Sequence, residues 1–485
     1  MDDTRSLTYV DLFAGCGGLS LGLERAGFEL VLAVEKSVMA AQTFYHNFVR
    51  RLPAQAEVDR EWAEFCSLPP SEQANHRLVV GEVGRVLSEG ALLEKFREHE
   101  IDLVAGGPPC QGFSMAGRRD PSDARNSLPW AFLEFVDLLH PKAVIIENVV
   151  GIGQDFVKHG AEAPFAQLRL ALEDTGPGYV VQPMRVNAMH FGVPQQRPRM
   201  LLVGLRSDLA SSWRLRRGLP FWRSEHLGTP LLAPMRHPGT PRTVDDALWD
   251  ITDSGYIHGC SEGRYKDKAG QYAAMMRCDR SWIPSLPESL PAPEPSNHVL
   301  RKHGSGIRLR FQIYQYLQMA GIKSKIMNIP RETRLPLEER RARVSAALVG
   351  APLPAIVPTG RLADTLEELT SLIMSNGTRK HSQRALRAKH PAPTMMSLPD
   401  DFVHHLSPRT LTVREMARLQ SFPDAFEFRS KETTGSDRRR FEVPQYTQVG
   451  NAVPPLLAEA VGSAVANAIK FHADCDSSAS ILHGS

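Results

Sequence analysis

Two short segments carry side chains that could make and break bonds. GGPPCQGFS (106–114) places Cys110 directly after an apolar run, on a loop that two prolines stiffen. A lone cysteine is most often a small buried hydrophobic residue, but on a rigid polar loop it can act as a thiolate nucleophile. AVIIENV (143–149) is a second apolar run, and its Glu147 could donate a proton to a ring nitrogen or could be a plain solvated carboxylate. If the two runs are neighbouring strands, the nucleophile and the acid lie close together.

Arginines of a third segment could bind an anion or a base. In GVPQQRPRM (192–200), Gln195, Arg197 and Arg199 alternate, so an extended chain places them on one face. Two guanidinium groups on one face suit a phosphate or a base carbonyl. The alternative is the charged outer face of an edge strand.

A glycine-rich turn predicts a nucleoside site. VDLFAGCGG (10–18) follows an apolar run and precedes a helical pattern, a place where backbone N–H groups can approach a ligand. Glu35 ends the next apolar run, LVLAVE (30–35), and a carboxylate there can accept hydrogen bonds from ribose hydroxyls. The turn lacks the GxGxxG spacing that seats the pyrophosphate of NAD. It therefore favours a nucleoside without a pyrophosphate, such as S-adenosyl-L-methionine.

These segments need a scaffold that brings strand ends together. Over the first 205 residues, short apolar runs alternate with helical patterns, which predicts an α/β fold with a parallel, doubly wound sheet. Such sheets bind ligands at the carboxyl ends of their strands. We expect strands at 7–13, 30–35, 101–107, 143–149 and 201–205, and a helix at 19–28.

The remainder of the chain follows a different pattern. Residues 206–408 are rich in proline and predict a second lobe with long loops and one clear helix, at 306–321. LTVREMARLQSF predicts a helix that Thr412 and Glu415 cap reciprocally.

A last apolar helix is expected at 451–471, followed by a short polar tail. Just before it, in QVGNAVPP, Gly450 and Asn451 could form its N-cap.

Composition excludes several classes of protein. The 485 residues are 42% hydrophobic and 23% charged, which is globular and not disordered throughout. We expect two or three domains, no secretory signal and no apolar run of about 18 residues that would span a membrane. The six cysteines show no zinc or disulfide spacing, so we expect no metal site and reduced thiols.

Charge is concentrated in the middle of the chain. The net charge is only +3, but residues 301–343 hold eleven lysines and arginines against three acidic residues. Shorter basic stretches lie at 379–389 and 438–440. They suit a polyphosphate partner such as nucleic acid, although solvated helix faces would look the same.

Together these segments resemble the C5-cytosine DNA methyltransferase family. The matches occur in the family's order, from DLFAGCGG through Glu35, GGPPCQGFS, ENV, QQRPR and LTVREMARLQSFP to QVGNAVPP. They span residues 10 to about 462, and the unmatched middle is where the family places its variable DNA-recognition lobe. The resemblance implies a Rossmann-like, S-adenosylmethionine-dependent methyltransferase domain with a smaller, irregular target-recognition domain.

The resemblance also implies a mechanism. Cys110 would attack C6 of a cytosine flipped out of duplex DNA, and Glu147 would protonate or hydrogen-bond N3. The activated C5 would take a methyl group from S-adenosyl-L-methionine. Arg199 matches the arginine that holds the base, and Arg197 would support the site.

The family pattern assigns cofactor contacts as well. Phe13 matches the adenine-packing aromatic residue and Glu35 matches the ribose ligand. The other matching positions are Gly15, Cys16, Gly18, Pro109, Leu128, Asn451 and Val453. One position departs from the pattern, because Glu82 in GEVGRV stands where the family has an aspartate that contacts adenine. The segment 46–80 has no assignment.

The resemblance sets the expected organisation and partners. The catalytic and cofactor-binding domain would be 1–205 with 441–472, the DNA-recognition domain 206–440, and a flexible tail 473–485. We expect duplex DNA as substrate, a restriction endonuclease acting on the same site as a functional partner, and a monomer in the bacterial cytoplasm at the nucleoid, with no membrane association.

Two other functions are open at this point. One branch of the family methylates transfer RNA with the same Cys and Glu, but it carries a CFT tripeptide that is absent here. A non-enzymatic binder with the same fold would be indicated by loss of Cys110 or Glu147, and both are present.

Overall fold

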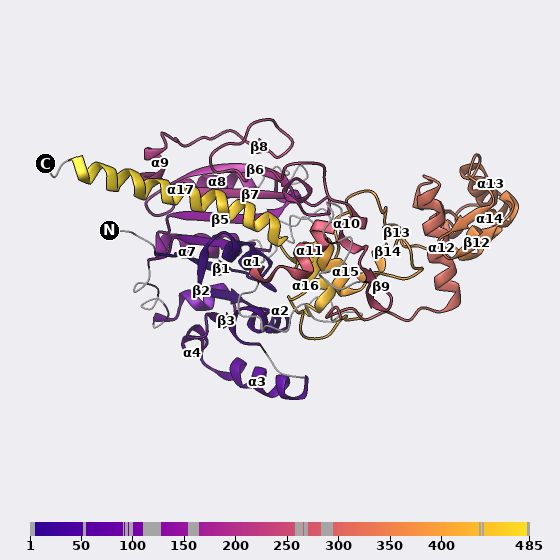
Figure 1. The fold of residues 1–485 in the computed structure, drawn as a ribbon, viewed down its shortest axis with the longest axis horizontal. Helices are drawn as coiled ribbons and strands as arrows, with labels where there is room; N and C mark the ends of the chain where they lie inside the picture. Colours follow the sequence, from indigo (N-terminus) through magenta and orange to yellow (C-terminus); the bar gives the residue numbers. More distant parts are fainter. Residues whose placement is uncertain are drawn as a thin grey trace.

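A computed structural model shows the architecture of the chain (Figure 1). It describes residues 5–51, 55–90, 92, 96, 100–109, 128–153, 164–257, 265, 270–282, 294–435, 438 and 441–482. Cys110 lies outside the described residues.

An eight-stranded sheet is the centre of the first lobe. Its strands are β1 (Leu7–Leu12), β2 (Phe28–Glu35), β3 (Leu78–Val80), β4 (Leu103–Gly106), β5 (Ala143–Val149), β6 (Tyr179–Asn187), β7 (Pro198–Arg206) and β8 (Trp222–Arg223). They lie in the order β3-β2-β1-β4-β5-β7-β6-β8, and only the pairings that involve β7 are antiparallel. The predicted doubly wound α/β sheet is confirmed, and its strand order reverses between β1 and β4. The expectation that the sheet is parallel throughout is wrong for β7, which is antiparallel to both of its neighbours.

All five expected strands are present, but β3, β6 and β8 were not predicted. The longest of these, β6, contains Gln182 and Pro183, which break the apolar run and argue against a strand. Both residues are buried, and the Gln182 side-chain amide donates to the carbonyl of Pro220 at 2.7 Å. Tertiary contacts therefore satisfy a buried polar group whose burial no local sequence pattern predicts.

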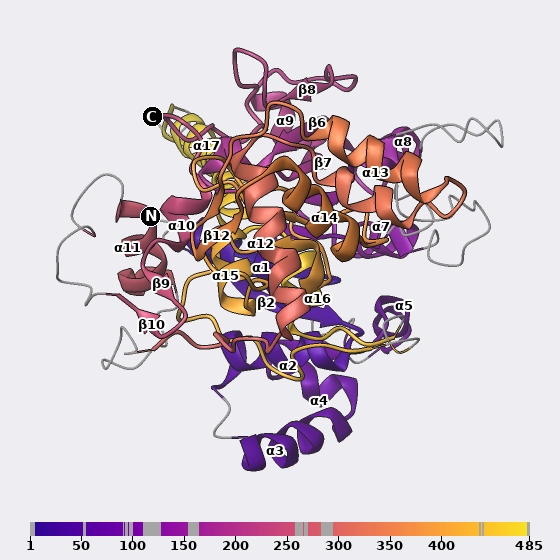
Figure 2. The same cartoon turned by 90° about the vertical axis from the view of Figure 1, so that its right-hand side faces the viewer.

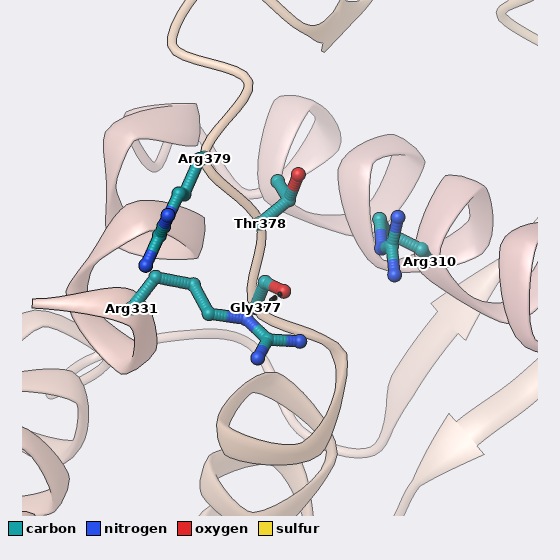
Figure 3. A pocket seen from close by; sticks show the side chains of 5 residues that line it. All are labelled: Arg310, Arg331, Gly377, Thr378 and Arg379. Atoms are coloured by element: carbon teal, nitrogen blue, oxygen red, sulfur yellow. Dashed lines mark hydrogen bonds between the residues drawn. The ribbon is translucent and has the colours of Figure 1, made fainter. Parts of the chain in front are cut away.

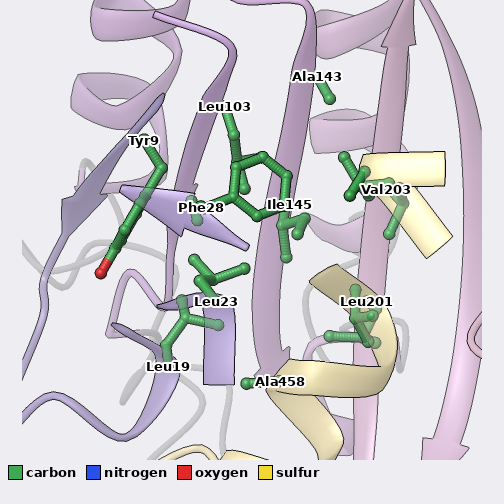
Figure 4. Close-up of a cluster of buried hydrophobic side chains, with 14 of the residues drawn as sticks. Tyr9, Leu19, Leu23, Phe28, Leu103, Ala143, Ile145, Leu201, Val203 and Ala458 are labelled. Atoms are coloured by element: carbon green, nitrogen blue, oxygen red, sulfur yellow. The ribbon is translucent and has the colours of Figure 1, made fainter. Parts of the chain in front are cut away.

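Helices cover both faces of the sheet. On one face α1 (Gly18–Arg25) and α17 (Pro455–Leu482) pack against alternate strand residues such as Tyr9, Leu103 and Ile145 (Figure 4). On the other face α7 (Leu128–Leu139) and α8 (Pro164–Asp174) pack against the intervening residues. This two-residue alternation is what a sheet buried on both sides requires.

The C-terminal helix starts later and ends later than expected. A separate helix, α16 (Gln445–Asn451), precedes it, so Gly450 and Asn451 end one helix and do not cap the next. The N-cap interpretation is wrong for these two residues. The backbone of the predicted tail is helical as far as Leu482.

One helical stretch, residues 445–470, is long and apolar enough to cross a membrane by length and composition, contrary to the expectation that no such run exists. Just over half of its most apolar window is buried inside the protein. Because α17 packs along α1 in the core, its apolar side chains already have partners, and the stretch is weak evidence for a membrane span.

The 46–80 segment extends the edge of the sheet next to β3. It forms α3 (Gln55–Ser67) and α4 (Pro70–Ala74). Trp62 and Phe65 stack with ring centroids 5.4 Å apart, and Tyr45 packs against both rings. These rings join the core on the α1 side of the sheet, so the segment has a packing role.

The middle of the chain contains two further large hydrophobic cores, besides a small cluster of Trp249, Tyr265 and Ala273. One joins α10 (Val244–Leu248), α11 (Gln271–Cys278), α15 (Val413–Leu419) and α16 to residues of the first lobe, including Cys16 and Leu21. The other lies within a helical lobe at the far end of the molecule, which faces the viewer in Figure 2.

The helical lobe, residues 305–380, consists of helices and one short hairpin. It contains α12 (Ser305–Met319), the 3-10 helix η8 (Ser324–Arg331), α13 (Leu337–Ala347), the hairpin β11–β12 (Ala355–Val357 and Gly360–Ala363) and α14 (Leu366–Asn376). The predicted helices at 306–321 and 410–423 correspond to α12 and α15, and Thr412 and Glu415 form the predicted capping box.

The short elements complete the chain. They are α2 (Val38–Phe44), the π-helix η1 (Tyr45–Val49), α5 (Val83–Leu87), η3 (Val150–Gly153), η4 (Ala188–Phe191), α9 (Ser207–Ser212), β9 (Ile251–Thr252), β10 (Gly255–Tyr256), η7 (Arg280–Trp282), β13 (Arg384–Ala385), η9 (Pro399–Asp401) and β14 (Phe402–Val403). Cys278 is in a disulfide bond, which corrects the expectation of reduced thiols throughout.

Close packing of α1 on α17 gives the first testable prediction. A Cβ added at Gly22 would lie 2.4 Å from the Ala458 Cβ and 2.4 Å from the Pro455 carbonyl oxygen. Gly22→Ala should therefore lower the free energy of unfolding by about 1–3 kcal/mol, measured by urea denaturation. Gly84→Ala is the control, because nothing lies within 4 Å of a Cβ at that exposed helical position. Equal stability of the two variants would contradict the observed packing.

Candidate active site

The carboxyl ends of β1, β4 and β5 meet where the strand order reverses. A Cβ on Gly106, the last residue of β4, would lie 2.2 Å from the carbonyl oxygen of Leu12 in β1. A Cβ on Gly107 would lie 3.1 Å from the Glu147 carboxylate in β5. Glycines at both positions therefore let the start of the PPC segment run directly between the two neighbouring strands.

The turn after β1 is fixed by the carboxylate of Glu35. One oxygen of Glu35 accepts a hydrogen bond from the Gly15 N–H at 2.8 Å, and the other accepts one from the Ser37 N–H at 2.6 Å. Burial raises the pKa of Glu35 above its ordinary value. Gly15 has a φ of 58°, and a Cβ there would meet nothing within 4 Å, so the space beside this turn is open.

Phe13 holds a strained backbone conformation at the same edge. Its φ is 62°, in the left-handed region that non-glycine residues seldom adopt. The side chain is only partly buried and packs on the α7 face of the sheet. Strain of this kind is concentrated at ligand sites, where it fixes a side chain that the site uses.

Asp11 is a buried carboxylate that the sequence analysis did not single out. It is fully buried, and its Oδ2 accepts a hydrogen bond from the Ser20 hydroxyl at 2.6 Å. Its Oδ1 is buried and has no hydrogen-bond partner in the described part of the chain. Burial, with a contribution from the nearby Glu35, raises the pKa of Asp11 to about 7. An unsatisfied buried acceptor beside an open turn suits a polar ligand.

Glu147 and Arg199 form an ion pair at the end of β5. The Nε of Arg199 lies 2.6 Å from a carboxylate oxygen of Glu147, and both side chains are about 10% exposed. The pairing of Val149 with Arg199 between antiparallel β5 and β7 brings the two residues together. The next residue, Asn148, donates from its side-chain amide to the Pro108 carbonyl at 2.9 Å. Asn148 thus ties the end of β5 to the loop that leads to Cys110, a role its position beside Glu147 could have suggested.

Arg197 is fully buried and joins three parts of the chain. Its terminal nitrogens donate to the carbonyls of Met395 at 3.2 Å, Gly450 at 2.7 Å and Ala452 at 3.0 Å. Burial lowers the pKa of Arg197. No described carboxylate bonds to it, so backbone carbonyls supply its compensation.

Among the remaining predicted cofactor positions, Cys16 and Gly18 are buried. Cys16 is buried, its thiol lies 3.7 Å from the Gln448 carbonyl oxygen, and burial raises its pKa to about 12, so this thiol is unreactive. The Val453 carbonyl oxygen would lie 2.4 Å from a Cβ on Gly18, which brings the C-terminal turn onto the start of α1.

Three further positions are open to solvent at least in part. Asn451 and Pro109 are exposed, and Leu128 at the start of α7 is partly buried. The side chain of Asn451 accepts a hydrogen bond from the Ser397 hydroxyl at 3.3 Å.

Glu82 is exposed and paired with a lysine. Its carboxylate lies 2.6 Å from the Lys36 Nζ, and hydrogen bonding to this lysine lowers the pKa of Glu82. The Gly81 N–H donates to the Glu35 carbonyl at 3.0 Å, so Glu82 lies close to the β2 end. No metal-binding group of three or more His, Cys, Asp or Glu side chains occurs among the described residues.

A family model described as C-5 cytosine-specific DNA methylase matches residues 7–467. The chain belongs to this family. It is a DNA cytosine C5-methyltransferase, as the resemblance of its motifs predicted.

Curated relatives match along nearly the whole chain. The type II methyltransferase M.DdeI of Desulfomicrobium norvegicum is 29% identical over 464 residues, which cover 95% of this chain and 88% of the relative. M.XorII of Xanthomonas oryzae pv. oryzae is 29% identical over 469 residues, which cover 95% and 85%. Both relatives are described as type II methyltransferases.

A solved structure shows the same fold. It is described as a prophage-encoded DNA modification methyltransferase from E. coli, and it matches with a TM-score of 0.59 at 23% identity, covering 96% of this chain and all of that chain. The Rossmann-like methyltransferase fold that the motifs implied is therefore confirmed.

The raised pKa of Asp11 makes the stability of this methyltransferase depend on pH. The folded protein keeps a proton on Asp11 up to about pH 7, whereas the unfolded chain releases it near pH 4, so this group destabilises the fold as pH rises between those values. Asp11→Asn removes the effect. Relative to the unmodified protein, it should gain about 2 kcal/mol of unfolding free energy between pH 5 and pH 8.

Urea denaturation at both pH values measures this gain. Asp364→Asn, on an exposed aspartate paired with Arg361, is the control and should show no comparable pH-dependent gain. If the free energies of unfolding of Asp11→Asn and the unmodified protein differ by the same amount at both pH values, Asp11 is ionised in the folded protein.

Proposed function

We propose that the protein transfers a methyl group from S-adenosyl-L-methionine to C5 of a cytosine flipped out of a specific duplex DNA sequence. The observation that carries this proposal is the position of the Glu147–Arg199 pair beside Gly107, where the PPC segment leaves the sheet. A carboxyl group and a guanidinium group are thereby held together beside Gly107, which precedes Cys110 by three residues in the sequence.

The edge of the sheet around β1 and β2 has features that fit the methyl donor. Asp11 offers an unsatisfied acceptor, the space beside Gly15 is open, and the Glu35 carboxylate has acceptor sites left for two ribose hydroxyls. Phe13 would pack on the adenine. The donor, when bound, supplies an electrophilic methyl group on a sulfonium.

The remaining predicted contacts would line the rest of that site. Pro109, Leu128, Asn451 and Val453 would form its walls, and the buried Cys16 and Gly18 would shape the turn through packing. The Lys36 pair draws Glu82 outward, so we propose that Glu82 contacts the adenine only if that pair opens.

Catalysis would begin with the thiolate of Cys110. It forms a bond to C6 of the cytosine, while Glu147 protonates or hydrogen-bonds N3 and so stabilises the resulting enamine. C5 then takes the methyl group. Loss of the C5 proton to a base and cleavage of the bond between C6 and Sγ restore the aromatic ring and the thiolate.

The two arginines would act in different ways. Arg199 holds Glu147 in place through its Nε, donates from Nη1 to the Pro198 carbonyl at 2.9 Å, and can present Nη2 to the base. Arg197 has all its observed bonds to backbone carbonyls, so we propose a positioning role for it.

The target base must leave the duplex, because C6 is inaccessible within the stack. We propose that residues 206–440 recognise the DNA sequence, and that 1–205 with 441–472 form the catalytic unit. The separate core of the helical lobe supports a distinct unit in this region. We further propose that the enzyme acts as a monomer in the bacterial cytoplasm and that a restriction endonuclease shares its target.

Replacement of the proposed nucleophile tests the reaction directly. Cys110→Ala should reduce transfer of labelled methyl groups to unmethylated duplex DNA by more than about 1,000-fold, because the covalent step is lost. Cys66→Ala, at a free and partly buried cysteine far from the site in the sequence, should keep its activity. Transfer RNA is assayed in parallel. Activity retained by Cys110→Ala, or label in RNA alone, would contradict the proposal.

The cofactor assignment has its own test. Glu35→Ala removes the acceptor for two ribose hydroxyls and should weaken binding of S-adenosyl-L-methionine by about 10- to 100-fold, measured by calorimetry. Glu72→Ala, at an exposed glutamate on α4, should bind as tightly as the unmodified protein. Because Glu35 also holds the turn, Glu35→Gln, which keeps one acceptor oxygen, should give an intermediate loss. Unchanged affinity in the folded Glu35 variants would overturn the assignment.

A further inference from the structure

Three arginines of the helical lobe gather around one cavity. Arg310 comes from α12, Arg331 from the end of η8, and Arg379 from the segment that follows α14. With Gly377 and Thr378 they line a cavity of about 350 Å³. Figure 3 shows the Gly377–Thr378 backbone running between Arg310 and Arg379, with the Arg331 side chain beside Gly377.

Two of these arginines are held in place by the end of a helix. The Arg310 Nε donates to the Asn376 carbonyl at 3.0 Å, and the Arg331 Nε donates to the Gly377 carbonyl at 2.8 Å. These carbonyls lie at the C-terminus of α14, where a helix favours positive charge. Each bond uses only Nε, so the terminal nitrogens, which form the fork that binds phosphate, have no hydrogen-bond partner among the described residues.

Packing requires glycine at the centre of the cavity wall. A Cβ on Gly377 would lie 2.4 Å from the Pro330 Cβ. The close approach brings the chain after α14 down onto η8, and so brings Arg379 to the same cavity as Arg331. The Thr378 N–H donates to the Met327 carbonyl at 2.8 Å and fixes this contact.

The three arginines are not neutralised by acidic side chains, unlike several other cations of the lobe. Arg343, Arg361 and Lys380 pair with Glu339, Asp364 and Asp400 at 2.7–2.8 Å. Arg310, Arg331 and Arg379 have no ion-pair partner in the described part of the chain. Three guanidinium groups around one cavity repel each other, and an anion is the ligand that would remove this repulsion.

The cavity is linked by a short stretch of chain to the catalytic edge. Arg379 lies 13 residues before Ala392, which pairs with Gln195, and Met395 accepts a hydrogen bond from Arg197. Thirteen extended residues reach at most about 45 Å. At one phosphate per about 3.4 Å of each strand, that corresponds to no more than about 13 base pairs.

We propose that Arg310, Arg331 and Arg379 bind a backbone phosphodiester of the duplex outside the target base, so that the helical lobe acts as a second grip on the DNA. This inference rests on the proposed function and adds to it a defined phosphate site. A phosphodiester fits better than a base edge, because three guanidinium groups line one cavity and no described carboxylate pairs with them.

The test measures binding of a fluorescent 40-base-pair duplex of mixed sequence between 50 and 300 mM salt. Arg379→Gln is the main variant, because Arg379 is exposed and makes no hydrogen bond or ion pair through its side chain within the described part of the chain. Loss of one phosphate contact should weaken binding about tenfold and reduce the slope of log affinity against log salt by about 0.9. The combination of Arg310→Gln, Arg331→Gln and Arg379→Gln should weaken binding further, while its loss of slope should stay near about 0.9, because the three arginines hold one phosphate.

Arg361→Gln is the matched control, since it removes the same charge from the same lobe at a paired residue away from the cavity. It should leave affinity and slope unchanged. Inorganic phosphate and transfer RNA are tested as competitors with each variant, and methyl transfer to duplex DNA is measured alongside.

The outcomes separate this inference from the proposed function. A loss of duplex affinity and of salt slope that is confined to the cavity variants supports the site. Equal duplex affinity and salt slope for Arg379→Gln, Arg361→Gln and the unmodified protein overturn it, even when methyl transfer to DNA is normal. A loss of transfer RNA or free phosphate binding without a change for the duplex also overturns it. Absence of methyl transfer in the unmodified protein would count against the proposed function and not against the site.

Discussion

The guanidinium group of Arg197 lies where three distant parts of the chain meet. It bonds to the carbonyls of Met395, Gly450 and Ala452 from a position just before β7. A buried cation is costly unless its hydrogen bonds are satisfied, so the arrangement holds only when all three segments are in place. The first lobe, the middle region and the C-terminal turn are thereby brought to one edge of the sheet, next to the Glu147–Arg199 pair.

Buried charge recurs in α15, which connects the middle region to the rest of the protein. Arg418 bonds to Asp250 at 3.0 Å and to Asp424 at 2.6 Å, and all three side chains are nearly inaccessible to solvent. Arg414 donates to the backbone carbonyls of Pro423 and Phe426 and also lies 3.8 Å from the Asp424 carboxylate. Removal of one partner from such a network leaves an uncompensated charge, so these residues fix one relative position of the elements that they join.

The two ends of the molecule differ in their electrostatics. The edge near β1 and β2 holds the buried carboxylate of Asp11 and the half-buried carboxylate of Glu35, which suit a ligand that brings hydroxyl or ammonium donors. The helical lobe instead holds unpaired arginines around an open cavity. A substrate with a polyanionic backbone and a separate cationic methyl donor would use both ends at once.

Local sequence patterns were sufficient for much of the fold and for the choice of chemistry. The apolar runs predicted five strands, Thr412 and Glu415 predicted a capping box, and the spacing of the motifs predicted the family, because each of these signals depends on neighbouring residues. The partners of the site residues depended on tertiary structure. No local pattern shows that Arg197 bonds to Gly450, that Asp11 is left with an unsatisfied oxygen, or that Gly377 packs on Pro330, since these contacts join segments that only the folded chain brings together. The sequence by itself determined which chemical groups are present and on which elements, whereas burial and long-range packing decided which of them are paired and which are left to bind a ligand.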